Sequence, residues 1–176
     1  MLDSLITSKT RVKLLLKFFL NNETKGHLRG MEKEFGESTN AIRMELNRFT
    51  DAGLLTSEHI ANKRVYKANT SHPLYNDINN ILRKAVGIDK LVERVTSKIG
   101  NLDSAYLTGS FAAGLDSDTI ELALVGDDLD TGYIDNLIQK AEELMHRKIM
   151  YLLLNKEQMN HFFKDKPTLL IWKKDR

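Results

Sequence analysis

Residues 107–126, LTGSFAAGLDSDTIELALVG, say most about how the C-terminal half of the chain folds. The stretch begins at the end of a short strand, 104–108, turns at Gly109-Ser110, passes small residues and enters a second strand at 120–125. Because alternate side chains of a strand point to one face, Thr119 and Glu121 share a face there. The pattern predicts two strands joined through a glycine-containing turn, with polar side chains beside that turn.

This stretch resembles the signature of the nucleotidyltransferase fold, which is found in small antitoxin-type nucleotidyltransferases, kanamycin nucleotidyltransferase and DNA polymerase beta. In that signature, Gly-Ser is followed by a strand reading acid–apolar–acid, whose two carboxylates hold Mg²⁺ against nucleotide phosphates. Here Thr119 stands at the first acid position, and only the second, Glu121, is acidic. The family's third acid lies on a later strand, where Met150 takes its place. We therefore expect the fold without catalysis, metal or cofactor, and a vestigial nucleotide site at Gly109, Ser110 and Glu121.

An active enzyme is the first alternative. It requires Glu121 to work with Asp116 or Asp118 through a distorted loop. Asp118 lies three residues from Glu121, so on a continuous strand it faces the other side. The sequence therefore disfavours this alternative.

Composition is that of an ordinary globular protein, with 176 residues, 41% hydrophobic and 28% charged. The absence of cysteine excludes disulfides and thiolate metal sites and fits a reducing cytoplasm. No signal-peptide pattern and no membrane-spanning apolar run is present, so we expect a cytoplasmic protein with no membrane partner. Residues 1–87 carry 14 basic and 9 acidic residues, whereas 88–176 carry 12 and 15. The basic N-terminal half is the better candidate for binding a polyanion.

The N-terminal half predicts three helices and a hairpin. Apolar residues recur at helical spacing over 8–20 and 27–35, and again in a third helix that follows a turn at 37–40 and runs to about 52. One strand is expected to begin at 54–56 and to pair with 64–68, with 61–63 at the hairpin tip. This is the order of a winged helix-turn-helix, in which the third helix reads DNA and the hairpin, or wing, lies beside it.

Polar residues lie on the outward side of the third helix and on the hairpin. Arginine and asparagine suit guanine and adenine edges in the major groove, while hydroxyl groups and hairpin cations suit phosphates. The predicted DNA-binding residues are Ser38, Thr39, Asn40, Arg43, Asn47, Lys63 and Arg64.

The remaining segments divide the chain into three parts. A winged helix is expected over 1–70, a helical linker over 71–100, and a nucleotidyltransferase-like α/β domain with a small mixed sheet over 101–176. The linker contains two predicted helices, 74–86 and 89–99. The last part continues with a helix at 131–146, a strand at 148–154, a short helix at 156–163 and an apolar segment at 169–172. The predicted fold class is therefore α+β.

The stretch Phe49-Thr-Asp-Ala-Gly-Leu-Leu resembles the phrase in bacterial winged-helix repressors of the ArsR and MarR kind. The whole order of elements resembles bacterial regulators, found mainly in Bacteroidetes, that fuse an ArsR-like winged helix to a nucleotidyltransferase-like domain. The resemblance implies a DNA-binding transcriptional regulator whose C-terminal domain senses a ligand or mediates assembly.

Double-stranded DNA is thus the expected partner, and the small-molecule effector is unknown. A homodimer is expected because such regulators pair two-fold on palindromic sites, with the apolar faces of 74–86 and 89–99 as the candidate interface. The second alternative is a protein-binding adaptor, which neither binds DNA nor catalyses a reaction.

Overall fold

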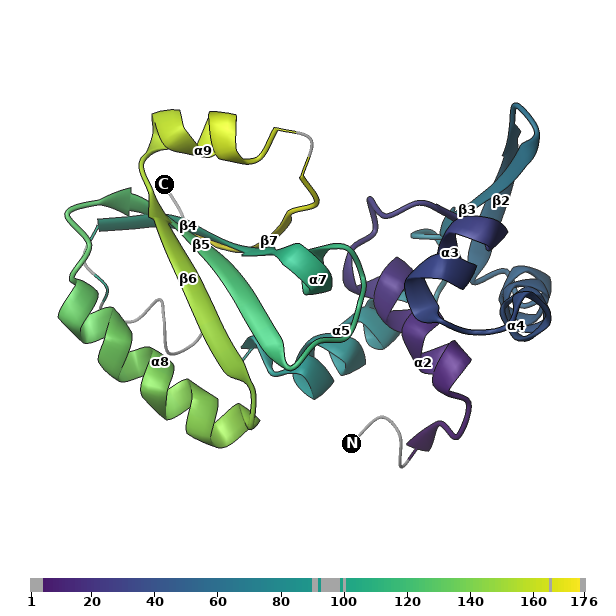
Figure 1. Cartoon of the computed structure of the whole chain (residues 1–176), viewed down its shortest axis with the longest axis horizontal. Helices are drawn as coiled ribbons and strands as arrows, with labels where there is room; N and C mark the ends of the chain where they lie inside the picture. Colours follow the sequence, from purple (N-terminus) through teal and green to yellow (C-terminus); the bar gives the residue numbers. More distant parts are fainter. Residues whose placement is uncertain (1–4, 90–91, 93–98, 100, 165, 175–176) are drawn as a thin grey trace. The chain divides into compact units, whose positions relative to one another are not determined.

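A computed structural model describes residues 5–89, 92, 99, 101–164 and 166–174. These residues form an α+β structure with two small sheets, as the sequence predicts (Figure 1). They divide into two units, one made of residues up to Ala85 together with Gly114–Asp116, and one made of Val86–Ala113 and the rest from Ser117. None of the described helices is long and apolar enough to cross a membrane.

Three helical segments open the N-terminal unit. Helix α2, Lys9–Leu15, continues as the π-helix η1, Leu16–Leu20, and is followed by α3, Leu28–Phe35, and α4, Thr39–Asp51. Ser8 and Ser38 cap α2 and α4, each side chain accepting a hydrogen bond from the backbone N–H three residues later. Gly36 ends α3 with a φ of 63°, a left-handed conformation that glycine adopts without strain.

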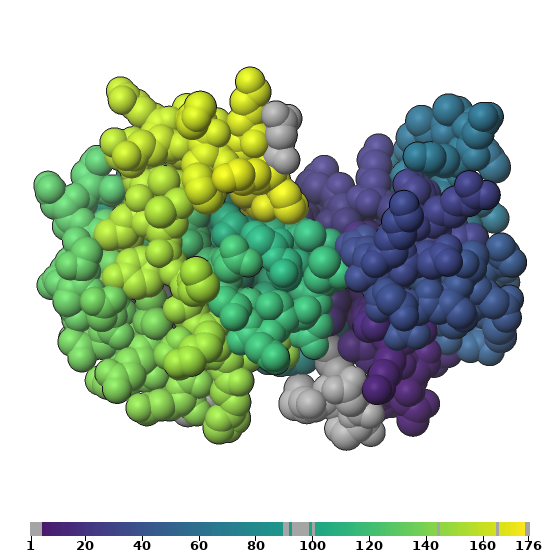
Figure 2. All heavy atoms as spheres, viewed as in Figure 1, coloured from purple at the N-terminus to yellow at the C-terminus, as the bar shows by residue number. Residues whose placement is uncertain are grey.

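The predicted hairpin is present, and only its tip differs from the prediction. Its strands are β2, Leu55–Ile60, and β3, Lys63–Ala68, paired in register from Leu55 and Ala68 to Ile60 and Lys63. The tip is therefore the two-residue turn Ala61-Asn62, and Lys63, expected at the tip, begins β3 instead. The hairpin stands out from the rest of this unit in the space-filling view (Figure 2).

A third strand, β1, was not predicted. It comprises only Gly26–His27 and pairs antiparallel with β3, so the sheet order is β1-β3-β2. Two residues are too short for an alternating pattern to be visible in the sequence. The pairing places the start of α3 against the hairpin.

Aromatic and aliphatic side chains fill the core of this unit. Phe18, Phe19, Met31, Ile42 and Leu46 are fully buried there. Helix α5, Tyr75–Val86, packs on this core rather than standing apart from it. The Tyr75 ring lies 5.8 Å from that of Phe19, and the amide of Asn79 donates to the Phe19 carbonyl. That carbonyl needs a partner because it lies at the end of a helix.

The C-terminal unit contains a four-stranded mixed sheet in the order β6-β5-β4-β7. Strand β4 (Asn101–Thr108) pairs antiparallel with β5 (Thr119–Asp127) and β7 (Leu169–Lys173). Strand β6 (Lys148–Leu154) runs parallel to β5, and α8 (Thr131–Met145) connects the two. A small mixed sheet is what the sequence predicts, and the final apolar segment proves to be its edge strand β7.

Two short helices, α7 and α9, flank the strands of this unit among the described residues. Helix α9, Lys156–Phe162, lies over one face of the sheet (Figure 1), where Met159, Phe162 and Phe163 pack on Ala123 and Val125. The expected turn at Gly109-Ser110 is the start of the helical turn α7, Gly109–Ala112, which follows β4 directly. The helix predicted at 89–99 falls mostly outside the described residues.

Candidate nucleic-acid interface

Helix α4 separates apolar and polar side chains onto two faces. Ile42, Leu46 and Phe49 are buried in the core, while Arg43 and Asn47, four residues apart, are exposed on the other face. Met44 is also exposed, with 49% of its surface accessible. The helix therefore offers cationic, amide and apolar groups to a partner.

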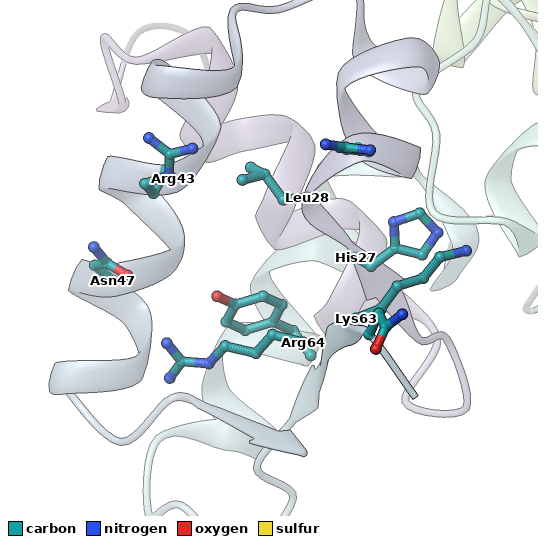
Figure 3. A pocket seen from close by; sticks show the side chains of 9 residues that line it. His27, Leu28, Arg43, Asn47, Lys63 and Arg64 are labelled. Atoms are coloured by element: carbon teal, nitrogen blue, oxygen red, sulfur yellow. The ribbon is translucent and has the colours of Figure 1, made fainter. Parts of the chain in front are cut away.

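A groove lies between α4, the start of α3 and the hairpin. It has a volume of about 610 Å³, and Figure 3 shows Arg43 and Asn47 on its α4 side, with Arg64 extending from the hairpin. The lining residues are His27, Leu28, Arg29, Arg43, Asn47, Asn62, Lys63, Arg64 and Tyr66. The structure thus brings together four of the seven residues predicted to bind DNA, namely Arg43, Asn47, Lys63 and Arg64.

The groove is strongly positive. Arg29, Arg43, Lys63 and Arg64 contribute four cations, and no acidic side chain is among the described residues that line it. Cations gathered in a concave surface raise the local potential and attract a polyanion. The groove therefore gathers more positive charge than the net charge of +2 for the whole chain suggests.

Arg64 is held in place by two neighbours. Its Nε donates to the Ser57 hydroxyl at 2.9 Å, and its guanidinium lies 5.2 Å from the centre of the Tyr66 ring. Both contacts hold the long Arg64 side chain in one orientation. Its conformational entropy is therefore already reduced before a partner binds.

Sequence reasoning missed His27, Leu28, Arg29, Asn62 and Tyr66. His27 caps α3, with Nδ1 accepting from the Gly30 N–H at 3.1 Å. In a neutral imidazole the other nitrogen then carries the proton and can donate to a phosphate oxygen. His27, Leu28 and Arg29 enter the groove because β1 pairs with β3, and no local sequence pattern predicts that pairing. Asn62 and Tyr66 belong to the hairpin itself.

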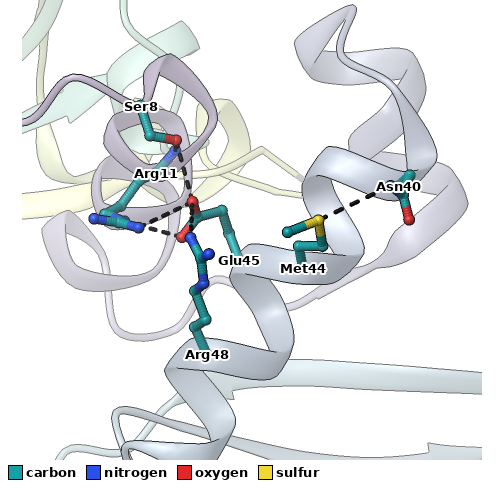
Figure 4. Close-up of polar contacts among 6 residues, drawn as sticks. All are labelled: Ser8, Arg11, Asn40, Met44, Glu45 and Arg48. Atoms are coloured by element: carbon teal, nitrogen blue, oxygen red, sulfur yellow. Dashed lines mark hydrogen bonds and ion pairs between the residues drawn. The ribbon is translucent and has the colours of Figure 1, made fainter.

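The other three predicted residues lie at the start of α4, outside the groove-lining set. The Ser38 hydroxyl accepts from the Ala41 N–H as the helix cap, and Thr39 is half-buried. Asn40 is exposed, and its amide lies 3.9 Å from the Met44 sulfur (Figure 4). Asn40 and Met44 thus form one edge of the outward face of α4.

Glu45 anchors α4 to the first helix (Figure 4). Its nearly buried carboxylate accepts from Arg11 Nε at 2.9 Å, from the Ser8 hydroxyl at 3.2 Å and from Arg48 at 3.1 Å. Burial raises the pKa of Glu45, but the hydrogen bond and charge of Arg11 outweigh it, so the pKa lies below the ordinary value of 4.5. The network fixes the orientation of α4 relative to α2.

We predict that Glu45 makes the stability of the chain depend on pH in the acid range. Because the pKa of Glu45 is lower in the folded chain, the unfolded chain takes up the proton first as the pH falls. The stabilisation by Glu45 is therefore complete above about pH 4.5. It is lost as the pH falls through the lower pKa of the folded state. In urea titrations, Glu45→Gln should be less stable than wild type at neutral pH. The gap should narrow as the pH falls below the ordinary carboxyl pKa and through the lower pKa of folded Glu45. Glu32→Gln, at an exposed position of α3, controls for the lost charge, and a gap that is constant with pH would contradict the prediction.

The predicted vestigial site lies at the other unit's Gly-Ser turn. Glu121 is in register with Thr108 on β4 and with Met150 on β6, and Thr119 is in register with Lys148. Met150 is 63% exposed, so a thioether rather than a carboxylate lies beside Glu121 at the surface. Among the described residues, no three histidine or acidic side chains come together in a way that holds a metal.

Gly109 and Glu121 are in close contact. Gly109 has a φ of 59°, and a Cβ at this position would collide with the Glu121 carboxylate. Any side chain at position 109 is therefore strained by both its backbone and its neighbour. The Glu121 carboxylate therefore rests directly against the Gly109 turn.

Comparison with known proteins gives only distant likenesses. No family model and no curated protein matches the chain. A mutant of the toxin–antitoxin MntA–HpeT aligns at 20% identity and a TM-score of 0.40, covering 51% of this chain and 75% of that one. Reduced HlyU from Vibrio cholerae aligns at 12% identity and 0.36, covering 55% and 86%. A candidate nucleotidyltransferase from Sulfolobus solfataricus aligns at 22% identity and 0.37, covering 52% and 82%. At these scores we draw no conclusion about function from them.

Proposed function

We propose that the N-terminal unit is a winged helix-turn-helix that binds double-stranded DNA and that the protein regulates transcription. The observation that carries this proposal is the groove, in which Arg43 and Asn47 of α4 stand opposite Lys63 and Arg64 of the hairpin. Four cations without a lining acid favour a polyanion, and the arginine and asparagine add groups that match base edges.

Helix α4 enters the major groove in this proposal. Arg43 reads guanine through a bidentate contact, Asn47 reads adenine, and the exposed Met44 contacts a thymine methyl group. Lys63, Arg64 and His27 contact the DNA phosphates on either side of the major groove. The buried side of α4 and the Glu45 network hold the helix so that these side chains are presented together.

A salt-titrated binding assay tests this function. The protein is mixed with a pool of short duplexes, and the bound fraction is sequenced and then measured singly at several salt concentrations. The proposal expects a steep salt dependence together with a preferred sequence. Salt-independent binding, or none, would instead favour the adaptor alternative.

A homodimer forms part of the proposal, because two copies read a two-fold site. Leu74, in the turn just before α5, is 53% exposed, and Ile81 on α5 is 52% exposed, so they supply apolar surface for the contact. Light scattering at micromolar concentration should give twice the chain mass, and Ile81→Glu should give the monomer. A monomeric wild-type protein, free and on DNA, would refute dimerisation.

The C-terminal unit transfers no nucleotide in this proposal. Thr119 offers a weak neutral ligand, and the Met150 thioether is a poor partner for a hard cation, which leaves Glu121 alone to compensate a triphosphate. Incubation with labelled nucleoside triphosphates, Mg²⁺ or Mn²⁺ and candidate acceptors should therefore give no labelled product. Transfer that disappears in Glu121→Gln would overturn the prediction and favour the enzyme alternative.

A further inference from the structure

A second cavity lies on the C-terminal unit between α9 and the sheet. Its volume is about 620 Å³, within the range of small-molecule sites. Apolar groups of Tyr106, Val125 and Met159 form its floor, and Val125 is fully buried. Its polar lining residues are Asp103, Ser104, Lys156, Asn160, Lys173 and Lys174.

The lining carries more positive than negative charge. Asp103 is its single carboxylate among the described residues, and it is already paired with Lys156 at 3.0 Å. The Lys174 N–H donates to the Asp103 carbonyl at 2.9 Å, and Lys173 is in register with Ser104, so both lysines are fixed at this edge by the backbone. Within the described part of the chain, neither side chain makes an ion pair.

We propose that this cavity binds a small organic anion. The negative group of the ligand lies against the ammonium groups of Lys173 and Lys174, and its apolar body packs on Tyr106, Val125 and Met159. Lysine presents a compact point charge with three donors, which suits a rounded phosphate, sulfonate or carboxylate head. The amide of Asn160 adds a neutral hydrogen-bonding group at the rim.

The site is separate from the vestigial nucleotide site. The cavity includes Val125, near one end of β5, whereas Glu121 and the Gly109 turn lie toward the other end of that strand. The proposal also stands apart from DNA binding, because every residue it uses belongs to the C-terminal unit. The two proposals therefore fail or succeed independently.

The test uses anilinonaphthalene sulfonate, a fluorescent aromatic anion, with the full chain. The wild type should bind one equivalent with a rise in fluorescence. Lys173→Gln combined with Lys174→Gln should weaken binding by about tenfold or more. Lys140→Gln combined with Lys164→Gln, two exposed lysines of the same unit that do not line the cavity, should leave the affinity unchanged.

Further controls test whether the dye binds in this cavity and whether the variants fold. Thermal unfolding of both double variants must match wild type, and Met150→Gln, on the exposed apolar part of the sheet, must leave dye binding intact. High concentrations of inorganic phosphate should compete only weakly, because phosphate lacks the apolar body. Three results would overturn the proposal. The first is equal dye affinity in wild type and the Lys173/Lys174 variant, and the second is an equal loss of affinity in the Lys140/Lys164 control. The third is loss of dye binding in Met150→Gln.

Discussion

Replacing Arg43 by alanine should weaken binding to the preferred DNA site by about 1–3 kcal/mol, or roughly 5- to 150-fold, and should relax the base preference at one position. Arg43 is exposed on α4 and lines the groove, while its neighbours Ile42 and Leu46 hold the helix in the core. The loss is large because a bidentate contact contributes energy and geometric discrimination together. Competition binding on the selected site and its single-base variants measures both.

Arg43→Lys is the matched variant. It keeps the positive charge but removes the planar fork, so the affinity for non-preferred DNA should be kept while the base preference is lost. Wild-type affinity and selectivity in both variants would remove Arg43 from a reading role. Equal weakening on all sequences would assign Arg43 to phosphate contact instead.

Removal of both hairpin cations, by Lys63→Ala with Arg64→Ala, should weaken binding to every sequence alike. Each lost phosphate contact makes the log–log dependence of affinity on salt shallower by about 0.9, so the double variant should lose about two units of slope. The effect on affinity is greatest at low salt, where counterion release is most favourable. Base preference should be unchanged, because phosphates carry no sequence information.

Lys33→Ala with Lys67→Ala is the charge-matched control for the hairpin. Both lysines are exposed in the same unit, on α3 and β3, and neither lines the groove. The control should retain nearly the full slope, since only cations close to phosphates release counterions. An unaltered slope in Lys63→Ala with Arg64→Ala would contradict the placement of the hairpin on DNA.

Local patterns in the sequence predicted most of the elements. Helix α4 ends and places its apolar residues Ile42, Leu46 and Phe49 as predicted, but it begins inside the expected turn at 37–40, because Ser38 caps its start. The two strands around Gly109, helix α8 and strand β6 likewise lie where their apolar patterns predict them. Each of these signals depends on residues that are close together in the chain.

The candidate groove could be predicted only in part. Arg43, Asn47, Lys63 and Arg64 were identified from residue type and position on their elements. Arg29 and His27 were not, because they reach the groove through the pairing of His27 with Val65, far along the chain. The cavity under α9 was also invisible, since its lysines come from α9 and the end of β7.

The sequence by itself thus determined the order and type of most elements, the cations of α4 and the hairpin, and the neutral residues Thr119 and Met150 on either side of the turn and helix. Only the tertiary structure decided which of those cations share a groove, which carboxylate holds α4 in place, and where the second cavity opens. The physical reason is that helical and strand periodicities, caps and turns act over a few residues. A binding surface is instead made by packing and strand pairing between distant segments, and its partners are set by the geometry of the folded chain.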